Sequence, residues 1–330
     1  MPLRVGFTFN QQRIRPEVTG EHDAEAEYDA PETLEAIRRA IESHGHEVIE
    51  LEATPDLPAR LVATRPDVVF NIAEGSGGRG REAHVPALLE LLGIPYTGSD
   101  AVALSLTLDK MLAKRLAGAH GVSTPGATVV EDGDEPLPDG LRFPLIVKPL
   151  REGSSMGVTR NSVVASEAEL RTSTRATMEK YRQPVLVEEY VAGREVTVGL
   201  IGHPQVRMLP PLEVVFLSDD PVPVYAFEMK QGPTEDVRLE VPACLEPEEV
   251  QALESAAIAC FHAFGCRDFA RLDFRLDGDG LAQFIECNPL PGLMPAWSDF
   301  CLMAEAAGID HRALIGEILS FAIARLETSA

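Results

Sequence analysis

The stretch RLDFRLDGDGLAQFIECNPLPG, Arg271 to Gly292, has the pattern of two strands joined by a turn. Apolar and polar residues alternate in both runs, as they do in a strand with one buried face. The segment DGDG, Asp277 to Gly280, consists of residues that favour a tight reversal. The sequence therefore predicts a β-hairpin with an unusual polar face, which mixes acids with an arginine and an asparagine.

Four polar side chains belong to this face: Arg271, Asp273, Glu286 and Asn288. If the turn leaves Leu276 opposite Leu281, Arg271 pairs with Glu286 and all four groups point the same way. Two carboxylates and an amide oxygen suit Mg²⁺ bound together with phosphate, and a guanidinium can stabilise charge on a reacting oxygen. A solvated face with an ordinary Arg–Glu pair is the alternative. The Gly/Pro loop NPLPG that follows favours a binding site.

The composition is that of an ordinary folded protein of 330 residues, with 25% charged and 45% hydrophobic residues. This length suits two or three modest domains. The formal net charge is -23, from 52 acidic and 29 basic residues, which disfavours a general nucleic-acid or anionic-membrane surface. A small anionic ligand held by a few local cations is still compatible with this charge.

The five cysteines are odd in number and form no CxxC pair, which indicates a reduced compartment rather than a disulfide framework or a zinc site. The start MPLRVGFTFN turns polar too soon for a signal peptide, and no apolar run approaches the roughly 20 residues of a membrane span. We therefore expect a soluble cytoplasmic enzyme that binds neither nucleic acid nor membrane.

The first part of the chain predicts a parallel α/β unit. Residues 3–9 predict a strand, a helix is expected from Pro31, and the run Val68–Ile72 predicts a second buried strand. The glycine-rich segment EGSGGRGRE predicts a loop after that strand. This order of elements indicates a small parallel α/β domain over residues 1–106.

A second unit is expected over residues 107–193. The segment LDKMLAKRLAGAHGV predicts a cationic helix with Lys110, and FPLIVKP predicts a strand that ends near Lys148. In the loop REGSSMGV that follows, the glycines allow close approach of a ligand, and Ser154 and Ser155 add hydroxyl donors. The lysine precedes the loop, so this is not the P-loop arrangement. A solvated surface lysine and an ordinary surface loop are the alternatives.

In PVLVEEYVAGREV a strand runs into Glu188 and then turns before Glu195. Backbone groups at such a change from strand to turn can meet an adenine edge, and a carboxylate can bind ribose hydroxyls. An edge strand with exposed acids is the alternative.

The remainder, residues 194–330, predicts a third unit. It is expected to contain longer strands, a helix at about 247–264, the hairpin, and a C-terminal helical stretch interrupted at Gly308. The proline-rich interval Pro210–Pro233 predicts a long loop or flap.

Taken in order, these segments resemble the ATP-grasp superfamily, and within it the D-alanine–D-alanine ligase family, over nearly the whole chain. The resemblance is carried by LLELLGIPYTGSD with LDK, then IVKPLREGSSMGV, VLVEEYVAGREVTV, FARLDFRLD and FIECNPLPG. It implies a three-domain α/β ATP-grasp architecture, in which an N-terminal parallel α/β domain precedes two α+β domains that clasp ATP.

The resemblance also implies roles for individual residues. The ATP-binding set is Lys110, Lys148, Ser154, Ser155, Glu188, Val191 and Glu195. The metal set, for two Mg²⁺ ions or Mn²⁺ in their place, is Asp273, Glu286 and Asn288. The catalytic set is Arg271, Ser154 and Glu27, and Ser298 is a candidate substrate contact.

The implied reaction joins a carboxylate to an amine through an acyl phosphate, with small amino acids or amines as substrates and ADP and phosphate as by-products. Families of this kind are commonly homodimers. A phosphotransferase that leaves the phosphoryl group on the acceptor, and a catalytically silent nucleotide-binding protein, are the alternatives.

The sequence departs from the family pattern at the amino-acid side. The segment FNQQRIRPEVTGEHDAEAEYDAPE replaces the glycine-rich turn after the first strand, so Glu27 is the nearest match for the family's substrate-binding glutamate. The flap tyrosine is not found where the family has it, because Gln231 follows Lys230. NPLPGLMPAWS replaces the usual threonine-serine form. We therefore expect a substrate range wider than D-alanine.

Overall fold

The N-terminal part of the protein is built around a small parallel sheet. The structure is a computed structural model that describes residues 2–14, 23–133, 135–230 and 234–328. The sheet has the order β2-β1-β3 and both pairings are parallel, as predicted. Its strands are β1 (Arg4–Phe9), β2 (Glu47–Glu52) and β3 (Val68–Asn71), and its helices are α1 (Pro31–Ser43), α2 (Leu57–Thr64) and α3 (His84–Leu92), the last preceded by the short helix η1 (Arg81–Ala83).

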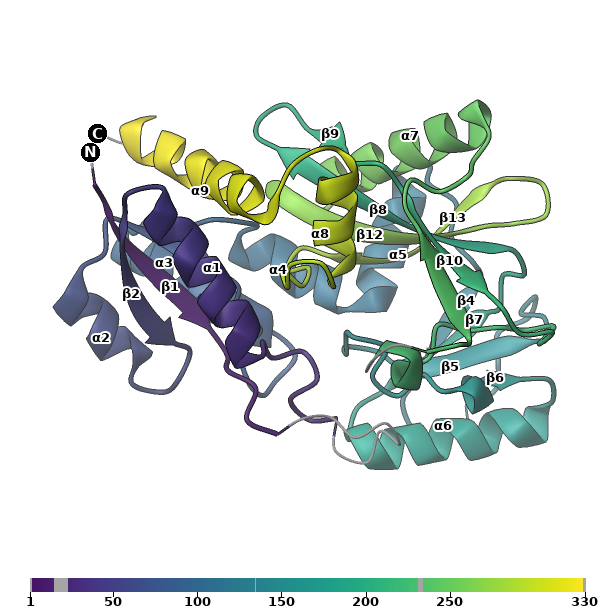
Figure 1. Ribbon diagram of the computed structural model, residues 1–330. Coiled ribbons are helices and arrows are strands. Elements are labelled where there is room, and N and C mark those ends of the chain that lie inside the picture. The colour runs from purple at the N-terminus through teal and green to yellow at the C-terminus, as the bar shows by residue number, and fades with distance from the viewer. Residues whose placement is uncertain (1, 15–22, 134, 231–233, 329–330) are drawn as a thin grey trace.

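A second sheet, of order β4-β7-β5-β6, is antiparallel throughout and packs against one long helix, α6 (Figure 1). Its elements are β4 (Ala127–Val130), β5 (Leu145–Pro149), β6 (Val163–Val164), β7 (Val185–Glu189), α6 (Glu167–Tyr181) and the short helix η2 (Arg160–Ser162). Two helices come before it in the chain, α4 (Ala101–Leu108) and α5 (Lys110–Ala119).

The third and largest sheet has the order β11-β10-β8-β12-β13, with β9 paired to β8. Its strands are β8 (Arg194–Gly202), β9 (Arg207–Met208), β10 (Leu212–Phe216), β11 (Val237–Glu240), β12 (Asp268–Leu276) and β13 (Ala282–Asn288). The helices of this part are η3 (Phe227–Lys230), α7 (Pro247–Ala263), α8 (Asp299–Ala306) and α9 (His311–Thr328). The break between α8 and α9 contains Gly308, as predicted.

The interval Pro210–Pro233 differs in part from its prediction as a long loop or flap, because it contains regular elements. It begins with the strand β10, which pairs with β8 on one side and β11 on the other, and it includes the short helix η3. Leu212 and Val214 of β10 are buried in the largest core cluster, so apolar packing forms a strand despite the neighbouring prolines. The flap position Gln231 lies outside the described residues.

Packing connects segments that are far apart in the sequence. The core beneath the parallel sheet joins Val5 and Ile37 to Ile315 of the C-terminal helix α9, which lies beside α1 (Figure 1). Helix α5 contributes Ala113 and Ala117 to the core of the third sheet. Neither α9 nor α5 forms a core with its sequence neighbours alone. The domain boundaries 1–106, 107–193 and 194–330 stay a prediction.

One ion pair fastens α9 to the strand that leads into the predicted site. Asp268, at the start of β12, is fully buried, and both its oxygens accept from the guanidinium of Arg325 at 2.6 Å. The same guanidinium donates to the carbonyl of Tyr96, at 2.7 Å. The backbone N–H of Gly98 completes the surroundings of Asp268, at 2.8 Å.

We expect Arg325→Met to lower the free energy of unfolding by about 3 kcal/mol, because it leaves the buried Asp268 carboxylate without its counter-charge. Urea denaturation measures the change. Arg207→Met is the matched control, because Arg207 pairs with Glu317 of the same helix at an exposed position, where an ion pair contributes about 0–1 kcal/mol. Equal losses in the two variants would contradict the role given to Asp268.

Candidate active site

The turn of the β12–β13 hairpin is one residue longer than predicted. Leu276 lies opposite Ala282, not Leu281, so five residues form the connection. The side chain of Asp277 organises it, because one of its oxygens accepts from the backbone N–H groups of Asp279 and Leu281, each at 3.0 Å. With this turn and no other change, Asp273 would lie opposite Ile285, and Glu286 would point to the other face.

A β-bulge corrects the register before the polar residues. Phe274 lies opposite Phe284, but the next pair is Asp273 with Glu286, so Ile285 is the extra residue of β13. The predicted Arg271–Glu286 pairing is therefore wrong, since Arg271 lies opposite Asn288. The expected outcome is nevertheless reached. Directly opposed residues share a face, and the bulge puts both carboxylates, the guanidinium and the amide on one face of the hairpin.

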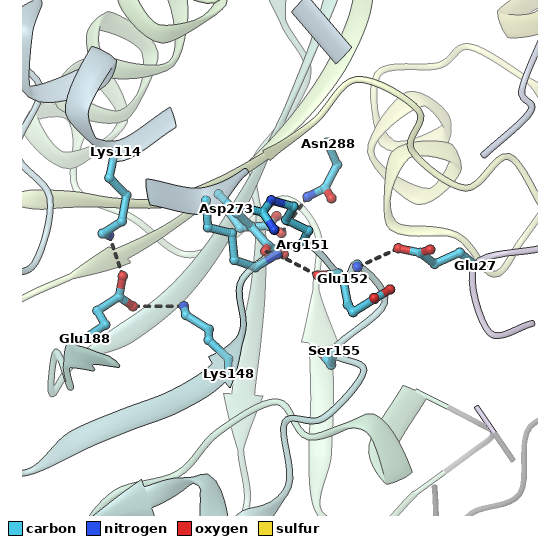
Figure 2. A network of polar contacts seen from close by, with 12 residues as sticks. Glu27, Lys114, Lys148, Arg151, Glu152, Ser155, Glu188, Asp273 and Asn288 are labelled. Carbon is cyan, nitrogen blue, oxygen red and sulfur yellow. Dashed lines mark hydrogen bonds and ion pairs between the residues drawn. The ribbon is translucent and has the colours of Figure 1, made fainter. Parts of the chain in front are cut away.

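Three of the four groups form a connected, largely buried polar network, of which Figure 2 labels Asp273 and Asn288, and the fourth, Glu286, pairs with Lys110. Arg271 donates to both oxygens of Asp273, from Nε at 3.1 Å and from Nη2 at 3.0 Å. Asn288 Nδ2 donates to Asp273 Oδ2 at 3.2 Å. Lys110 Nζ lies 2.9 Å from Glu286 Oε2 and donates to the backbone carbonyl of Glu152. Lys110 is thus a buried partner of the hairpin rather than a solvated surface lysine.

The two carboxylates differ electrostatically. Burial, with the charge of Glu286, raises the pKa of Asp273 above its ordinary value, against the opposing effect of Arg271. Burial also favours the neutral form of Glu286, but the charges of Lys110 and Lys148 outweigh it and hold its pKa below the ordinary value. Glu286 is therefore ionised, and the cations that keep it so are the two lysines assigned to ATP phosphates.

The donor set of this face fits Mg²⁺. Two carboxylates and an amide oxygen on adjacent strands are hard oxygen ligands, and Mg²⁺ in nucleotide sites takes one or two carboxylates together with phosphate oxygens and water. Within the described residues there is no group of three or more His, Cys, Asp or Glu side chains arranged for a metal. A metal here would therefore need the amide oxygen of Asn288 and the oxygens of a nucleotide.

At the other end of the site, Glu188 lies between two buried lysines (Figure 2). Lys148 Nζ donates to Glu188 Oε1 at 2.9 Å, and Lys114 forms an ion pair with Oε2. The lysine charges lower the pKa of Glu188 despite its burial, and burial lowers that of Lys114. Each oxygen of Glu188 is therefore engaged by one lysine.

The strand-to-turn segment after β7 is organised by Arg275, which is 6% exposed. Its guanidinium donates to Glu195 Oε2 at 2.6 Å and to the backbone carbonyl of Val191 at 3.0 Å. It also donates to the hydroxyl of Tyr190 at 2.8 Å. One side chain thus fixes both the backbone expected to meet adenine and the carboxylate expected to meet ribose.

The loop after β5 is held in an unusual conformation. Ser154 and Ser155 both have positive φ, 48° and 56°, which non-glycine residues adopt rarely and mostly where surrounding contacts require it. The Ser155 hydroxyl donates to the backbone carbonyl of Tyr225 at 3.0 Å. Tyr225 lies a few residues before the position at which the family tyrosine is missing, and it lines the same cavity as Ser154.

Glu27 connects the N-terminal part to this loop. Its carboxylate accepts from the backbone N–H of Gly153 at 2.5 Å (Figure 2), and it also accepts from Arg81 Nη2 at 2.7 and 2.9 Å. A Cβ at residue 153 would lie 2.6 Å from the Glu27 oxygen, so only glycine permits this approach. The sequence match for the family's glutamate thus falls beside the predicted acceptor loop.

A cavity of about 870 Å³ lies where the parallel sheet, the loop and the hairpin meet. The predicted residues that line it are Glu27, Lys110, Ser154, Arg271, Glu286, Asn288 and Ser298. Five predicted ATP residues lie outside its lining, Lys148, Ser155, Glu188, Val191 and Glu195, as does Asp273 of the predicted metal set. Ser298 is partly engaged, because its hydroxyl accepts from the backbone N–H of Met294 at 3.0 Å. The cavity therefore brings Glu27 and Ser154 together with Lys110 and most of the polar face of the hairpin.

Comparison with known proteins agrees with this geometry. Residues 130–320 match the family described as D-ala D-ala ligase C-terminus. The D-alanine–D-alanine ligase of Aquifex aeolicus is 35% identical over 292 residues, 87% of this chain and 94% of that protein. The chain belongs to the D-alanine–D-alanine ligase family. Members with this name are ATP-dependent ligases, so the chain is an ATP-dependent ligase of this family.

A further relative and two solved structures are also similar to this chain. The uncharacterized protein y4sG of Sinorhizobium fredii is 36% identical over 296 residues, 87% of this chain and 86% of y4sG. The crystal structure of the D-alanine–D-alanine ligase from Bacillus anthracis, complexed with ATP, covers 99% of this chain and all of its own, with a TM-score of 0.76 and 23% identity. The crystal structure of the VanG D-Ala:D-Ser ligase of Enterococcus faecalis has a TM-score of 0.76 and 20% identity, and it covers 98% of this chain and all of its own. At this identity the two structures confirm the ATP-grasp fold. None of the described helices is long and apolar enough to span a bilayer.

Three residues of this ligase site were missed by sequence reasoning: Lys114, Arg275 and Arg81. Lys114 lies one helical turn after Lys110 in a cationic segment, so its spacing was a usable signal. Arg275 and Arg81 gave none, because each is defined by partners more than 50 residues away in the sequence.

We expect Arg275→Met to raise the KM for ATP about tenfold, equivalent to about 1.4 kcal/mol, because Glu195 and the Val191 carbonyl lose the group that orients them. Turnover at saturating ATP should change less, and steady-state kinetics separate the two effects. Arg194→Met is the matched control, since Arg194 pairs with Glu213 in the same sheet at a more exposed position. A similar rise in that variant would argue against a role for Arg275 in orienting the ribose carboxylate.

Proposed function

We propose that the protein joins an amino-acid carboxylate to an amine in a reaction that consumes ATP and requires Mg²⁺. The observation that carries this proposal is that Lys110, Arg271, Glu286 and Asn288 line the same cavity as Glu27. A phosphate-binding lysine, hard oxygen ligands and a guanidinium are the groups that acyl transfer through an acyl phosphate needs. The relatives named D-alanine–D-alanine ligase support a small amino acid as substrate.

In the first step, Lys110 and Lys148 hold the phosphates of ATP while a carboxylate oxygen of the substrate attacks the γ-phosphorus. ADP leaves and an acyl phosphate forms. Mg²⁺, held by Asp273, Glu286 and Asn288, would neutralise charge on the phosphate oxygens. The loop that contains Ser154 and Ser155 would exclude water, which would otherwise hydrolyse the acyl phosphate.

In the second step, the amine attacks the acyl carbon. Arg271 contacts Asp273, one of the proposed metal ligands, and would stabilise the oxyanion of the tetrahedral intermediate. Collapse of that intermediate breaks the bond to phosphate, and the departing phosphate takes up the proton that the amine nitrogen loses as the amide forms. Ser154 and Tyr225 both line the cavity and are candidates for orienting the amine. We place the substrate side in residues 1–106 and the ATP-clasping parts in 107–193 and 194–330.

An ADP-release screen with single and paired D- and L-amino acids, followed by mass spectrometry of the products, tests this proposal. We expect ADP to accompany an amide-linked product in equal amount. A stable phosphorylated acceptor with no amide would indicate a phosphotransferase. Release of no ADP with any amino acid or amine would indicate a protein that binds nucleotide without catalysis. Robust product from D-alanine alone would show that the altered N-terminal loop does not widen the substrate range.

Asp273→Asn and Glu286→Gln should each abolish ADP release, because each removes one charge of the predicted metal site. Far-UV circular dichroism should show the fold largely intact. Turnover that survives either change would contradict the metal assignment.

Arg271→Met should lower kcat by about 10²-fold, the cost of losing one oxyanion donor, while ATP binding is retained. The measurement is kcat at saturating substrate, together with nucleotide binding by calorimetry. An unchanged kcat would assign Arg271 to structural support of Asp273.

A further inference from the structure

The wall of the cavity that the N-terminal part provides is strongly acidic. Its carboxylates are Glu27, Asp29, Glu32, Glu74 and Glu82. No lysine or arginine among the described residues up to 106 lines the cavity. An amino acid with a neutral side chain carries one ammonium group, so this wall holds more carboxyl groups than such a substrate would engage.

The guanidinium of Arg81, which contacts Glu27 of this wall, is already engaged. Arg81 donates through Nη2 to both oxygens of Glu27, and through Nη1 to the backbone carbonyl of Arg151 at 2.8 Å. It also lies 3.5 Å from a Glu152 oxygen. Glu27 is thus balanced by Arg81 and by the N–H of Gly153, and Arg81 has little capacity left for the other acids.

Three carboxylates of the wall have no such partner. Glu82 is 8% exposed, and its side chain makes no hydrogen bond or ion pair within the described part of the chain. The same holds for the side chains of Glu74 and Asp29. Buried carboxyl groups that serve structure are normally hydrogen-bonded, because an unsatisfied one costs about 1–3 kcal/mol or more. A nine-tenths-buried acid that faces a cavity without a partner indicates that a ligand supplies the partner.

The raised pKa values of these three acids agree with the lack of a nearby cation to pair with them. Burial, reinforced by the charge of Glu27, raises the pKa of Glu82 to about 8, against the effects of Arg81 and Lys110. Burial alone raises the pKa of Asp29 to about 7. Burial, with the charge of Glu82, raises the pKa of Glu74 well above its ordinary value. A bound cation would reverse these shifts and favour the charged carboxylates.

We propose that the substrate bound at this wall carries a second cationic group in addition to its α-ammonium: an amino acid whose side chain ends in an amine or a guanidine, received by Glu82 and Glu74. This inference rests on the proposed ligase function and deepens it by naming the substrate class. One ammonium of such a substrate binds near Glu27 and Asp29. The second cationic group binds Glu82 and Glu74, and the carboxylate extends toward Lys110 and Arg271.

Matched pairs of amino acids test the proposal, because they differ in the cationic group and little in size. The pairs are 2,4-diaminobutyrate with 2-aminobutyrate and lysine with norleucine, each as D and L forms, in the ADP-release assay with the full-length protein. We expect kcat/KM for the dibasic member of at least one pair to exceed that of its neutral partner at least tenfold. Equal or better use of the neutral members would overturn the inference and leave the ligase function standing.

The variant Glu82→Gln keeps the shape of the side chain and removes its charge. We expect it to reduce the preference for the dibasic member at least tenfold. Glu47→Gln, at an exposed position in β2 of the same domain, is the matched control and should leave the preference unchanged. A preference that survives in Glu82→Gln would overturn the role of Glu82.

Calorimetry in two buffers of different ionisation enthalpy separates binding from catalysis. At pH 7 a dibasic ligand should displace protons from Glu82 and its neighbours, and the neutral partner should displace fewer. Tighter binding with proton release but without ADP release would support the inference and contradict the ligase function. Binding without preference and without proton release would overturn the inference, whatever the catalytic result.

Discussion

This site depends on which face of the hairpin the side chains of β13 occupy. In an antiparallel pair the side chains alternate between two faces, so a shift of one residue moves a whole set of groups from one face to the other. The five-residue turn after Leu276 would send Glu286 into the apolar core, and the bulge at Ile285 returns it to the face of Asp273. Without the bulge, Lys110 would lose its carboxylate and the metal set would be divided.

The polar residues of the site come from several parts of the chain and pair with one another. Lys110 begins helix α5, where Asp109 caps the N-terminus by accepting from the N–H of Leu112. The same helix places Lys114 against Glu188, one turn later. A helix and two strands therefore present opposite charges to one another in a buried space, where each charge needs its partner to offset the cost of desolvation. Removing one member affects the others more than an exposed pair would.

The sequence allowed the hairpin, its polar face and the residues that form it to be predicted, but not the register. Alternation alone does not distinguish a four-residue connection from five, and it contains no sign of a bulge. The two deviations cancel in their effect on the face, so the grouping was right although the pairing was wrong. Strand β10 was missed because the prolines on both sides suggested a loop, whereas its burial depends on β8, β11 and the distant helices. Arg275 and Arg81 were missed for the same reason, since contacts over long sequence separations leave no local pattern.

The charge distribution shows how an acidic protein can accommodate a nucleotide. With a formal net charge of -23, the chain concentrates Lys110, Lys114 and Lys148 at buried positions and pairs each with a carboxylate. An incoming phosphate must then compete with Glu188 and Glu286 for these lysines, and part of the binding energy is used to exchange partners. A divalent cation would take over Glu286 and release Lys110 for phosphate, which gives a physical reason for nucleotide and metal to bind together. Asp29, Glu74 and Glu82 of the N-terminal wall form no ion pair within the described chain, and under our proposal the substrate supplies the cation that they lack.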